Sequence, residues 1–313
     1  MHVLGIDVGG SKTVCILADR DGRPLVTARG LGANLQSAGE LALETALHGV
    51  MEETLGSAGV LPAAICLGIA GMDRPDDVAV VRRIMSRIGH KAKILIVNDA
   101  LIALEAGIGA APGIVVVAGT GSIAYGRDAG GRAARAGGWG HVLGDEGSGY
   151  WLGRHALQAV ARAADGRGPA TRLGDRILAH FGLSRPQDLV PEIYFRRSQP
   201  LAIAALSGLV DACAADGDPV AARILDGAAD ELVGAAQAVA SRLHLTECPI
   251  LLAGGVFRTS ARLVAGVTAR VTSALPNAAV QRLQHEPVAG AVRLALAHAS
   301  GRAFVPSYDA TRA

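Results

Sequence analysis

Residues 5–13, GIDVGGSKT, combine glycines, hydroxyls, a lysine and an aspartate near the N-terminus. A Walker A phosphate loop reads G-x-x-x-x-G-K-[ST], with the lysine directly after the second glycine. Here Ser11 separates Gly10 from Lys12, and Asp7 places a negative charge inside the apparent phosphate cradle. The segment is therefore not a Walker loop, and any phosphate chemistry must give the aspartate a different use.

A second segment rich in glycine and hydroxyl groups, AGTGS, occurs at residues 118–122. Glycine amides can approach phosphate oxygens closely, and serine and threonine hydroxyls can donate hydrogen bonds to them. Two such turns, facing each other, could hold a triphosphate without a Walker lysine, while Asp7 held Mg²⁺ through metal-bound water. The predicted phosphate-binding residues are Gly9, Gly10, Ser11, Lys12, Gly119, Thr120, Gly121 and Ser122. The alternatives are ordinary turns, with Asp7 and Lys12 as solvated charges at strand ends.

The elements that would position these segments recur in the same order. Hydrophobic periodicity and turn residues predict a first series of strands at 3–8, 12–18, 24–28, 64–69 and 94–97, with helices at 38–55, 76–88 and 100–106. A second series has strands at 114–118, 123–127, 132–136, 249–253 and 279–283, with helices over much of 149–243 and at 260–275 and 287–299. The repetition predicts an α/β fold of two duplicated lobes. The alternative is a chance recurrence of hairpins in a glycine-rich chain.

Composition excludes several classes of protein. The chain has 313 residues, half of them apolar, enough for two lobes of ordinary size. A net charge of +2 without a long basic run argues against nucleic-acid binding. The apolar stretch at 201–215 is short and contains Asp211, so it is not expected to span a membrane. No signal-peptide pattern precedes the first strand, and we expect a soluble cytoplasmic protein.

The four cysteines are scattered without a C-x-x-C pair or zinc-binding spacing. We expect buried thiols in a reducing compartment rather than ligands. These residues are Cys15, Cys66, Cys213 and Cys248.

Further motifs extend the pattern along nearly the whole chain. They are GANLQ around Asn34, GIAGMDRP at Gly68–Pro75, VNDA at Val97–Ala100, GGWGHVLGDEGSGYWLG at Gly137–Gly153, AGGVF at Ala253–Phe257 and PVAGAVRLA at Pro287–Ala295. Together with GIDVGGSKT and AGTGS, they resemble the actin/Hsp70/sugar-kinase ATPase superfamily. More narrowly, the chain resembles the N-acetylglucosamine kinase family, grouped with the BadF/BadG/BcrA/BcrD ATPases.

The resemblance implies two ribonuclease H-like (actin-like ATPase) lobes with a central cleft. The expected N-terminal lobe is residues 1–107 plus 287–313, and the expected C-terminal lobe is residues 108–286. It also implies ATP and Mg²⁺ as cofactors, phosphorylation of a sugar 6-hydroxyl, and a homodimer.

Asp99 is the candidate catalytic residue. It follows a predicted strand and opens the next helix, so it lies at the strand's C-terminal end, where ligands bind in α/β folds. The residues alone leave two alternatives of similar weight. Asp99 is a general base, or Asn98 or Asp99 only caps the helix that follows. The resemblance implies that Asp99 accepts the proton of the sugar hydroxyl.

The resemblance also implies a set of ligand-binding residues. Those for the sugar are Asn34, Asp99, Ser122, Gly138, Trp139, Gly140 and Asp145, and those for the adenosine are Ala204, Gly254 and Gly255. Each has a structural alternative: a loop turn at Asn34, core packing for Trp139, a helix cap at 145–146 and a tight turn at 254–255.

One position departs from the family pattern. Animal-type family members have an asparagine after GTGS that contacts the amino sugar, whereas this chain has Ile123. Glucosamine, glucose and mannose therefore stay open as substrates beside N-acetylglucosamine. Two other classes share the fold: ATPase activators of CoA dehydratases, which hold an iron–sulfur cluster with cysteines, and sugar-responsive repressors, which add a helix-turn-helix. We expect neither, because the cysteines lack paired spacing and the first strand begins two residues after Met1.

Overall fold

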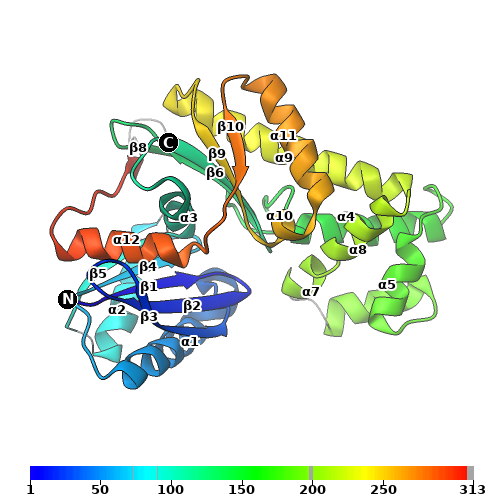
Figure 1. Ribbon diagram of the computed structural model, residues 1–313. Helices are drawn as coiled ribbons and strands as arrows, with labels where there is room; N and C mark the ends of the chain where they lie inside the picture. The colour runs from blue at the N-terminus through cyan, green and yellow to red at the C-terminus, as the bar shows by residue number, and fades with distance from the viewer. Residues whose placement is uncertain (73, 90, 197–199, 309–313) are drawn as a thin grey trace. The chain divides into compact units, whose positions relative to one another are not determined.

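The computed structural model describes residues 1–72, 74–89, 91–196 and 200–308. Asp73 of the GIAGMDRP segment lies outside the described residues. The chain divides into two compact units (Figure 1). The first comprises residues 1–115, 125–134 and 283–313, and the second comprises residues 116–124 and 135–282. The lobe boundaries expected from the resemblance stay a prediction.

The first unit contains a five-stranded sheet in the order β3-β2-β1-β4-β5. Its strands are β1 (Val3–Val8), β2 (Lys12–Ala18), β3 (Pro24–Leu31), β4 (Ala64–Ile69) and β5 (Lys93–Asn98). The first three pair antiparallel as consecutive hairpins, and β4 and β5 run parallel to β1. The predicted strands are confirmed, with β3 three residues longer than expected.

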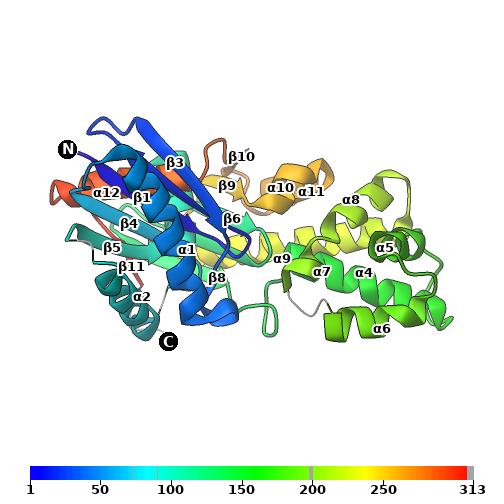
Figure 2. The ribbon, with the colours of Figure 1, turned by 90° about the horizontal axis from the view of Figure 1, so that it is seen from below.

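Helices cover both faces of this sheet (Figure 2). They are α1 (Leu35–Ala58), α2 (Pro75–Ile88), α3 (Asp99–Ile108) and α12 (Val288–Ala299). Alternate β1 residues Leu4, Ile6 and Val8 are buried in one hydrophobic core with apolar residues of α1 and α2. On the opposite face, a Cβ on Gly5 would lie 2.7 Å from Val292 of α12, so glycine permits close helix packing there.

Helix α1 begins three residues before the predicted start at 38. The Ala38 amide donates to the Asn34 carbonyl and closes a first turn, and Gly39, at φ 83°, then interrupts the helical geometry. Hydrophobic spacing did not detect this first turn, and it placed the kink at Gly39 inside a continuous helix.

The six-stranded second sheet has the order β10-β9-β6-β7-β8-β11. Its strands are β6 (Gly113–Ala118), β7 (Ser122–Arg127), β8 (Arg132–Gly137), β9 (Pro249–Ala253), β10 (Ala279–Arg282) and β11 (Ser307–Tyr308). The succession β8-β7-β6-β9-β10 repeats the succession β3-β2-β1-β4-β5 of the first sheet. The predicted duplication of an α/β unit is therefore confirmed. The two-residue strand β11 was not predicted, because it is too short to show a period.

The second unit is otherwise helical. Its α-helices are α4 (Gly149–Ala164), α5 (Leu173–Phe181), α6 (Leu189–Pro191), α7 (Pro200–Ala204), α8 (Ser207–Ala215), α9 (Pro219–Leu243), α10 (Gly255–Thr259) and α11 (Ala261–Ala274), with shorter turns at Pro186–Asp188 and Glu192–Arg196. The breaks predicted at 166–169, 184–186 and 217–219 are confirmed. The break between α7 and α8 and the short helix α10 were not predicted.

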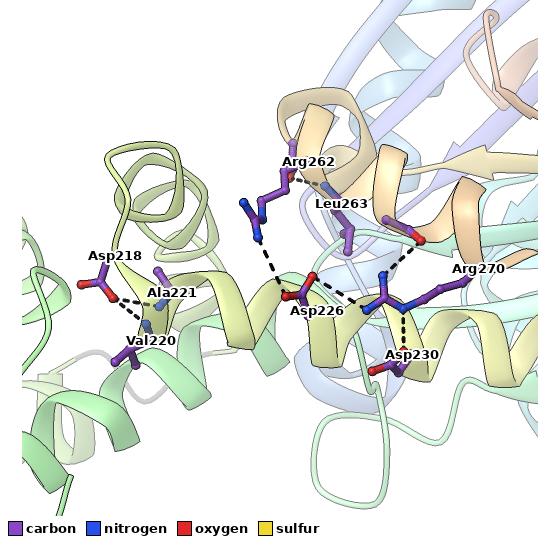
Figure 3. A network of polar contacts seen from close by, with 10 residues as sticks. Asp218, Val220, Ala221, Asp226, Asp230, Arg262, Leu263 and Arg270 are labelled. Carbon is purple, nitrogen blue, oxygen red and sulfur yellow. Dashed lines mark hydrogen bonds and ion pairs between the residues drawn. The ribbon is translucent and has the colours of Figure 1, made fainter. Parts of the chain in front are cut away.

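Ion pairs join α9 and α11 (Figure 3). Arg270 pairs with Asp230 at 2.6 Å and with Asp226 at 3.8 Å, and Arg262 also reaches Asp226 at 3.8 Å. Asp218 caps α9 by accepting from the amides of Val220 and Ala221. These charges supplement an apolar α9 face that is buried along its length.

Within the described ranges, no single helix is both long and apolar enough to cross a membrane. The segments Pro200–Ala215 and Pro219–Leu243 together reach the required length and hydropathy, but a 120° bend separates them.

Candidate active site

In the first unit, the predicted site residues gather at one edge of the first sheet. Strands β1, β4 and β5 are parallel and end in register, with Val8 beside Ile69 and Ile69 beside Asn98. The turn at 9–11 and the start of α3 therefore lie at the same edge, where α/β folds bind ligands.

Asp7 lies one residue before the end of β1 and is paired in register with Gly68 of β4. A Cβ on Gly68 would lie only 2.2 Å from Ile102 Cδ1, so this glycine lets α3 approach the sheet. Burial, which is the largest cause, and the charges of Asp99 and Glu286 raise the pKa of Asp7 to about 7 against the opposing effect of Lys12. The structure thus brings Asp7 and Asp99 into electrostatic contact.

Asn98, not Asp99, caps α3. The Asn98 side chain accepts a hydrogen bond from the Ala100 amide at 2.8 Å, as an N-cap residue does. Asp99 is the first helical residue, where a negative charge is favourable. Of the two cap assignments left open by the sequence, the one for Asn98 is confirmed and the one for Asp99 is wrong. The role of Asp99 as general base stays a prediction.

The turn at 9–11 is held by its neighbours. The Gly9 amide donates to the Lys12 carbonyl at 3.0 Å, and the Ala33 amide donates to the Gly9 carbonyl at 3.2 Å. A Cβ on Gly32 would lie 2.5 Å from the backbone of Gly10, so the loop before α1 packs directly on this turn. The loop brings Asn34 to the same edge.

The Asn34 side chain forms a local turn. Its Oδ1 accepts from the Gln36 amide at 2.9 Å, which confirms the structural alternative for this residue. A contact from Asn34 to sugar stays a prediction.

Lys12 is paired with Glu286, a residue that sequence reasoning missed. The Lys12 ammonium lies 2.7 Å from one Glu286 oxygen, and Arg29 lies 2.6 Å from the other. The hydrogen bonds from Arg29 and Lys12 lower the pKa of Glu286 to about 2. No local pattern could reveal this cluster, because Glu286 is separated from its partners by most of the chain. Lys12 as a nucleotide ligand stays a prediction.

In the second unit, predicted site residues surround the turn between β6 and β7. The Gly149 amide at the start of α4 donates to the Gly119 carbonyl at 2.8 Å, and the Tyr150 amide donates to the Thr120 carbonyl at 3.2 Å. A Cβ on Gly149 would lie 3.3 Å from the Cβ of Ala204. The structure therefore gathers the predicted phosphate turn and the predicted adenine wall within one unit.

Gly254 and Gly255, predicted as a pair, differ in their surroundings. Gly254 has φ 103°, and its Cβ would lie 2.2 Å from the Ala118 carbonyl oxygen, just before the phosphate turn. A Cβ on Gly255 would meet only the end of the Arg258 side chain, at 3.7 Å. Gly254 is thus required for packing, and Gly255 is not.

We expect Gly254→Ala to destabilise the protein by more than about 2 kcal/mol, since both positive φ and backbone overlap oppose a side chain. Gly255→Ala is the matched control. Its free energy of unfolding is expected to stay within about 0.5 kcal/mol of that of the native protein. Urea denaturation of both variants measures the difference. Equal stability of the two variants would contradict the close approach at Gly254.

Asp145 is buried and does not cap α4. Ser148 is the cap, since its hydroxyl accepts from the Trp151 amide, so the cap alternative for 145–146 is wrong. Asp145 adopts φ 60°, a conformation rare for residues other than glycine. It accepts from the Ser122 amide at 3.4 Å, and burial raises its pKa. A buried, strained carboxylate beside the turn is typical of a functional position.

The Ser122 hydroxyl already donates to the Glu146 carbonyl at 2.7 Å. A phosphate or sugar hydroxyl could receive this proton only if the bond to Glu146 broke. Ser122 as a ligand stays a prediction, with its oxygen available mainly as an acceptor.

Trp139 is 63% exposed, so the alternative of core packing is wrong. The Arg135 guanidinium lies over its ring, 4.9 Å from the centroid, in cation–π geometry. The flanking glycines Gly138 and Gly140 have φ of 71° and 83°, which turn the chain sharply around the indole. The ring is thus presented on a rigid turn rather than buried.

Trp139 lines a pocket of about 330 Å³ within the second unit. Its other walls include Ser122, Ile123 and, from α9, Glu231 and Leu232. Of the predicted sugar residues, the pocket brings together Ser122 and Trp139, and it places them beside Ile123, the one position that departs from the family pattern. The other predicted sugar residues do not line it, namely Asn34, Asp99, Gly138, Gly140 and Asp145. Sequence reasoning missed the α9 residues, since nothing in the sequence of α9 distinguishes exposed Glu231 and buried Leu232 from the helix's other exposed and buried positions.

The Asp7 carboxylate is the type of ligand that a hard cation such as Mg²⁺ prefers. Among the residues that the structure describes, no group of three or more His, Cys, Asp or Glu side chains could enclose a metal ion. Mg²⁺ rarely needs such a cage, because one or two carboxylates suffice when phosphates and waters complete the shell. Asp7, held at a raised pKa beside Asp99, supplies such a carboxylate.

Comparison of the sequence with known proteins identifies the family of this chain. Residues 4–295 match the sequence pattern of the BadF/BadG/BcrA/BcrD ATPase family. An N-acetylmuramic acid/N-acetylglucosamine kinase of Clostridium acetobutylicum is 40% identical over 260 residues, covering 82% of this chain and 85% of its own. An N-acetyl-D-glucosamine kinase of Dictyostelium discoideum is 32% identical over 309 residues, which cover 94% of this chain and 97% of the relative.

Solved structures agree in fold. A candidate N-acetylglucosamine kinase of Chromobacterium violaceum superposes with a TM-score of 0.78 at 29% identity, covering 94% of this chain and 98% of its own. A ROK-family glucokinase of Streptomyces griseus, solved with glucose and AMPPNP, has a TM-score of 0.59 at 21% identity. The match covers 94% of this chain and 98% of the glucokinase. The latter likeness shows only the shared actin-like fold. By the match over residues 4–295 and the identity to its curated relatives, the chain belongs to the BadF/BadG/BcrA/BcrD ATPase family.

Proposed function

We propose that this protein is an ATP-dependent kinase that phosphorylates the 6-hydroxyl of N-acetylglucosamine or a related amino sugar or hexose. The observation that carries the proposal is the pair Asp7 and Asp99 at the edge of the first sheet, beside the turn at 9–11. The names of the two curated relatives support the sugar class.

In the proposed reaction, Asp99 accepts the proton of the sugar hydroxyl as the hydroxyl oxygen attacks the γ-phosphorus of ATP. The bond from that phosphorus to the bridging oxygen breaks, and ADP leaves. The Gly9 and Gly119 amides already donate to the carbonyls of Lys12 and Gly121. The phosphates would therefore be bound by the other amides of residues 10–11 and 120–121 and by the hydroxyls of Ser11 and Thr120. Positioning and charge neutralisation supply most of the acceleration in such transfers, because the reaction needs little covalent chemistry from the protein.

Asp7 would hold Mg²⁺, which neutralises charge on the phosphates when bound. Asp145 and Asn34 would bind sugar hydroxyls, and Trp139 would offer an apolar face to the ring. A homodimer and a cytoplasmic location, implied by the family resemblance, stay predictions.

The sugar is tested with coupled ADP-release assays on N-acetylglucosamine, N-acetylmuramic acid, glucosamine, N-acetylmannosamine, glucose and mannose. ³¹P NMR of the product identifies the phosphorylated hydroxyl. We expect Ile123→Asn to shift the preference toward N-acetylated sugars, because it places an amide in the wall of the Trp139 pocket. A product phosphorylated at a position other than the 6-hydroxyl would refute the proposed regiochemistry.

The raised pKa of Asp7 predicts an effect of pH on stability. The ordinary carboxyl pKa is 3.8 and that of Asp7 is about 7, so the folded state favours the protonated form. Native stability therefore falls as pH rises from about 4 to 7, by at most about 4 kcal/mol from this residue. We expect Asp7→Asn to remove this decline, measured by urea unfolding at several pH values without Mg²⁺. An unchanged pH dependence in the variant would exclude a strained carboxylate at this position.

The burial of the four cysteines disfavours the alternative of an iron–sulfur activator. Cys15, Cys66 and Cys213 are fully buried, and Cys248 is 6% exposed. Burial raises the pKa of Cys15 to about 12 and that of Cys66 as well, which disfavours the thiolate that a cluster requires.

A further inference from the structure

A second pocket, of about 340 Å³, lies in the first unit at the C-terminal end of α12. Residues 293, 296, 297 and 300 line it from one face of the helix, as their spacing of three and four requires. Arg20, in the turn between β2 and β3, and Arg302, just beyond α12, close its sides. Three arginines from separate segments thus converge on one hollow, and no carboxylate is among the described residues that line it.

Two of these guanidinium groups have few protein partners. Arg20 lies 4.0 Å from Asp21, and both side chains are more than half exposed, so this ion pair is weak. The Nε of Arg302 donates to the Ser300 hydroxyl at 3.3 Å. Most of the donors of these two arginines are therefore available to a ligand.

Arg293 anchors the pocket to the rest of the unit. Its Nη1 donates to the carbonyls of Glu105 and Ala106 in α3, which holds one side of the guanidinium group and leaves its charge at the pocket wall. The opposite wall is also fixed, since a Cβ on Gly22 would lie 3.4 Å from Leu296 Cδ1, which places the β2–β3 turn in contact with α12.

Electrostatics favours an anion. The C-terminal end of α12 contributes roughly half a negative charge, which three guanidinium groups outweigh. Guanidinium groups bind phosphate oxygens through paired donors, and the volume is within the range of roughly 300–1,000 Å³ found for small-molecule sites. Leu296 and Ala297 supply an apolar wall beside the charges.

We propose that this pocket binds the phosphate group of a small molecule. The proposal does not depend on the kinase reaction, because none of the residues assigned to phosphoryl transfer lines the pocket.

The test is methyl NMR of the full chain, labelled at leucine, with Leu296 as the local reporter. Inorganic phosphate and glucose 6-phosphate are the two probes, titrated at constant ionic strength. The test variant is Arg20→Gln/Arg302→Gln, which retains Arg293 and its bonds to α3. The control variant, Arg82→Gln/Arg223→Gln, removes the same charge from exposed positions on α2 and α9.

We expect Leu296 to shift in a saturable manner in the native and control proteins, with affinity at least tenfold weaker in the test variant. Tighter binding of glucose 6-phosphate than of phosphate would identify a phosphate monoester as the ligand, and the reverse would identify the free ion. A Leu296 signal that does not respond to either probe, or that responds equally in the test variant, would overturn the proposal.

Discussion

Asp99→Asn is expected to lower kcat for sugar phosphorylation by about 10²–10⁴-fold, the usual contribution of a general base. Asparagine keeps the size of the side chain and its position as the first residue of α3, but it cannot accept the hydroxyl proton. Sugar-dependent ADP release gives kcat, and thermal unfolding shows whether the fold is retained. Activity within a few-fold of the native protein would remove Asp99 from the mechanism.

Asn98→Ala provides the matched control, since it changes the adjacent residue. It removes the side chain that accepts from the Ala100 amide and is expected to cost about 1 kcal/mol of stability. It leaves the Asp99 carboxylate in place, so kcat is expected to change only slightly. The two neighbouring variants therefore separate structural support of α3 from chemistry at its first residue.

Arg127→Met is expected to destabilise the first unit by about 3–5 kcal/mol, the largest stability effect predicted here. Arg127 and Glu105 form an ion pair in which both side chains are buried. The same guanidinium donates to the carbonyls of Ala111 and Gly109. Its removal would leave a buried carboxylate without its cation, which is far more costly than losing an exposed pair. Urea unfolding measures the loss.

Arg132→Met serves as the comparison for Arg127→Met. Arg132 pairs with Asp128 at 2.6 Å, but its side chain is 43% exposed, so a loss below about 1 kcal/mol is expected. The double variant Glu105→Met/Arg127→Met is expected to recover part of the stability, because no unpaired charge remains. An Arg127→Met protein as stable as Arg132→Met would refute the importance of the buried pair.

Features encoded locally could be predicted from the sequence. The strand at Pro249–Ala253 was predicted to the residue, because an apolar run is bounded there by proline and paired glycines. The duplicated order followed from turn residues and apolar spacing, and the two sheets repeat one succession of strands. Short elements such as α10 and β11 carry too few residues to show a period.

Features that depend on distant residues could not be predicted. Glu286 joins Lys12 and Arg29 only because α12 returns to the first sheet at the end of the chain. The difference between Gly254 and Gly255 depends on the Ala118 carbonyl, which no local pattern places beside them. Asp145 was identified through family resemblance, but its burial and positive φ required the fold.

The most direct test of the account is ADP release from Mg²⁺·ATP, measured with and without each sugar for the native protein and Asp99→Asn. The account predicts release that depends on an amino sugar or hexose, is stoichiometric with a sugar 6-phosphate, and is lost in the variant. Steady ATP hydrolysis that is indifferent to every sugar and to Asp99 would contradict it.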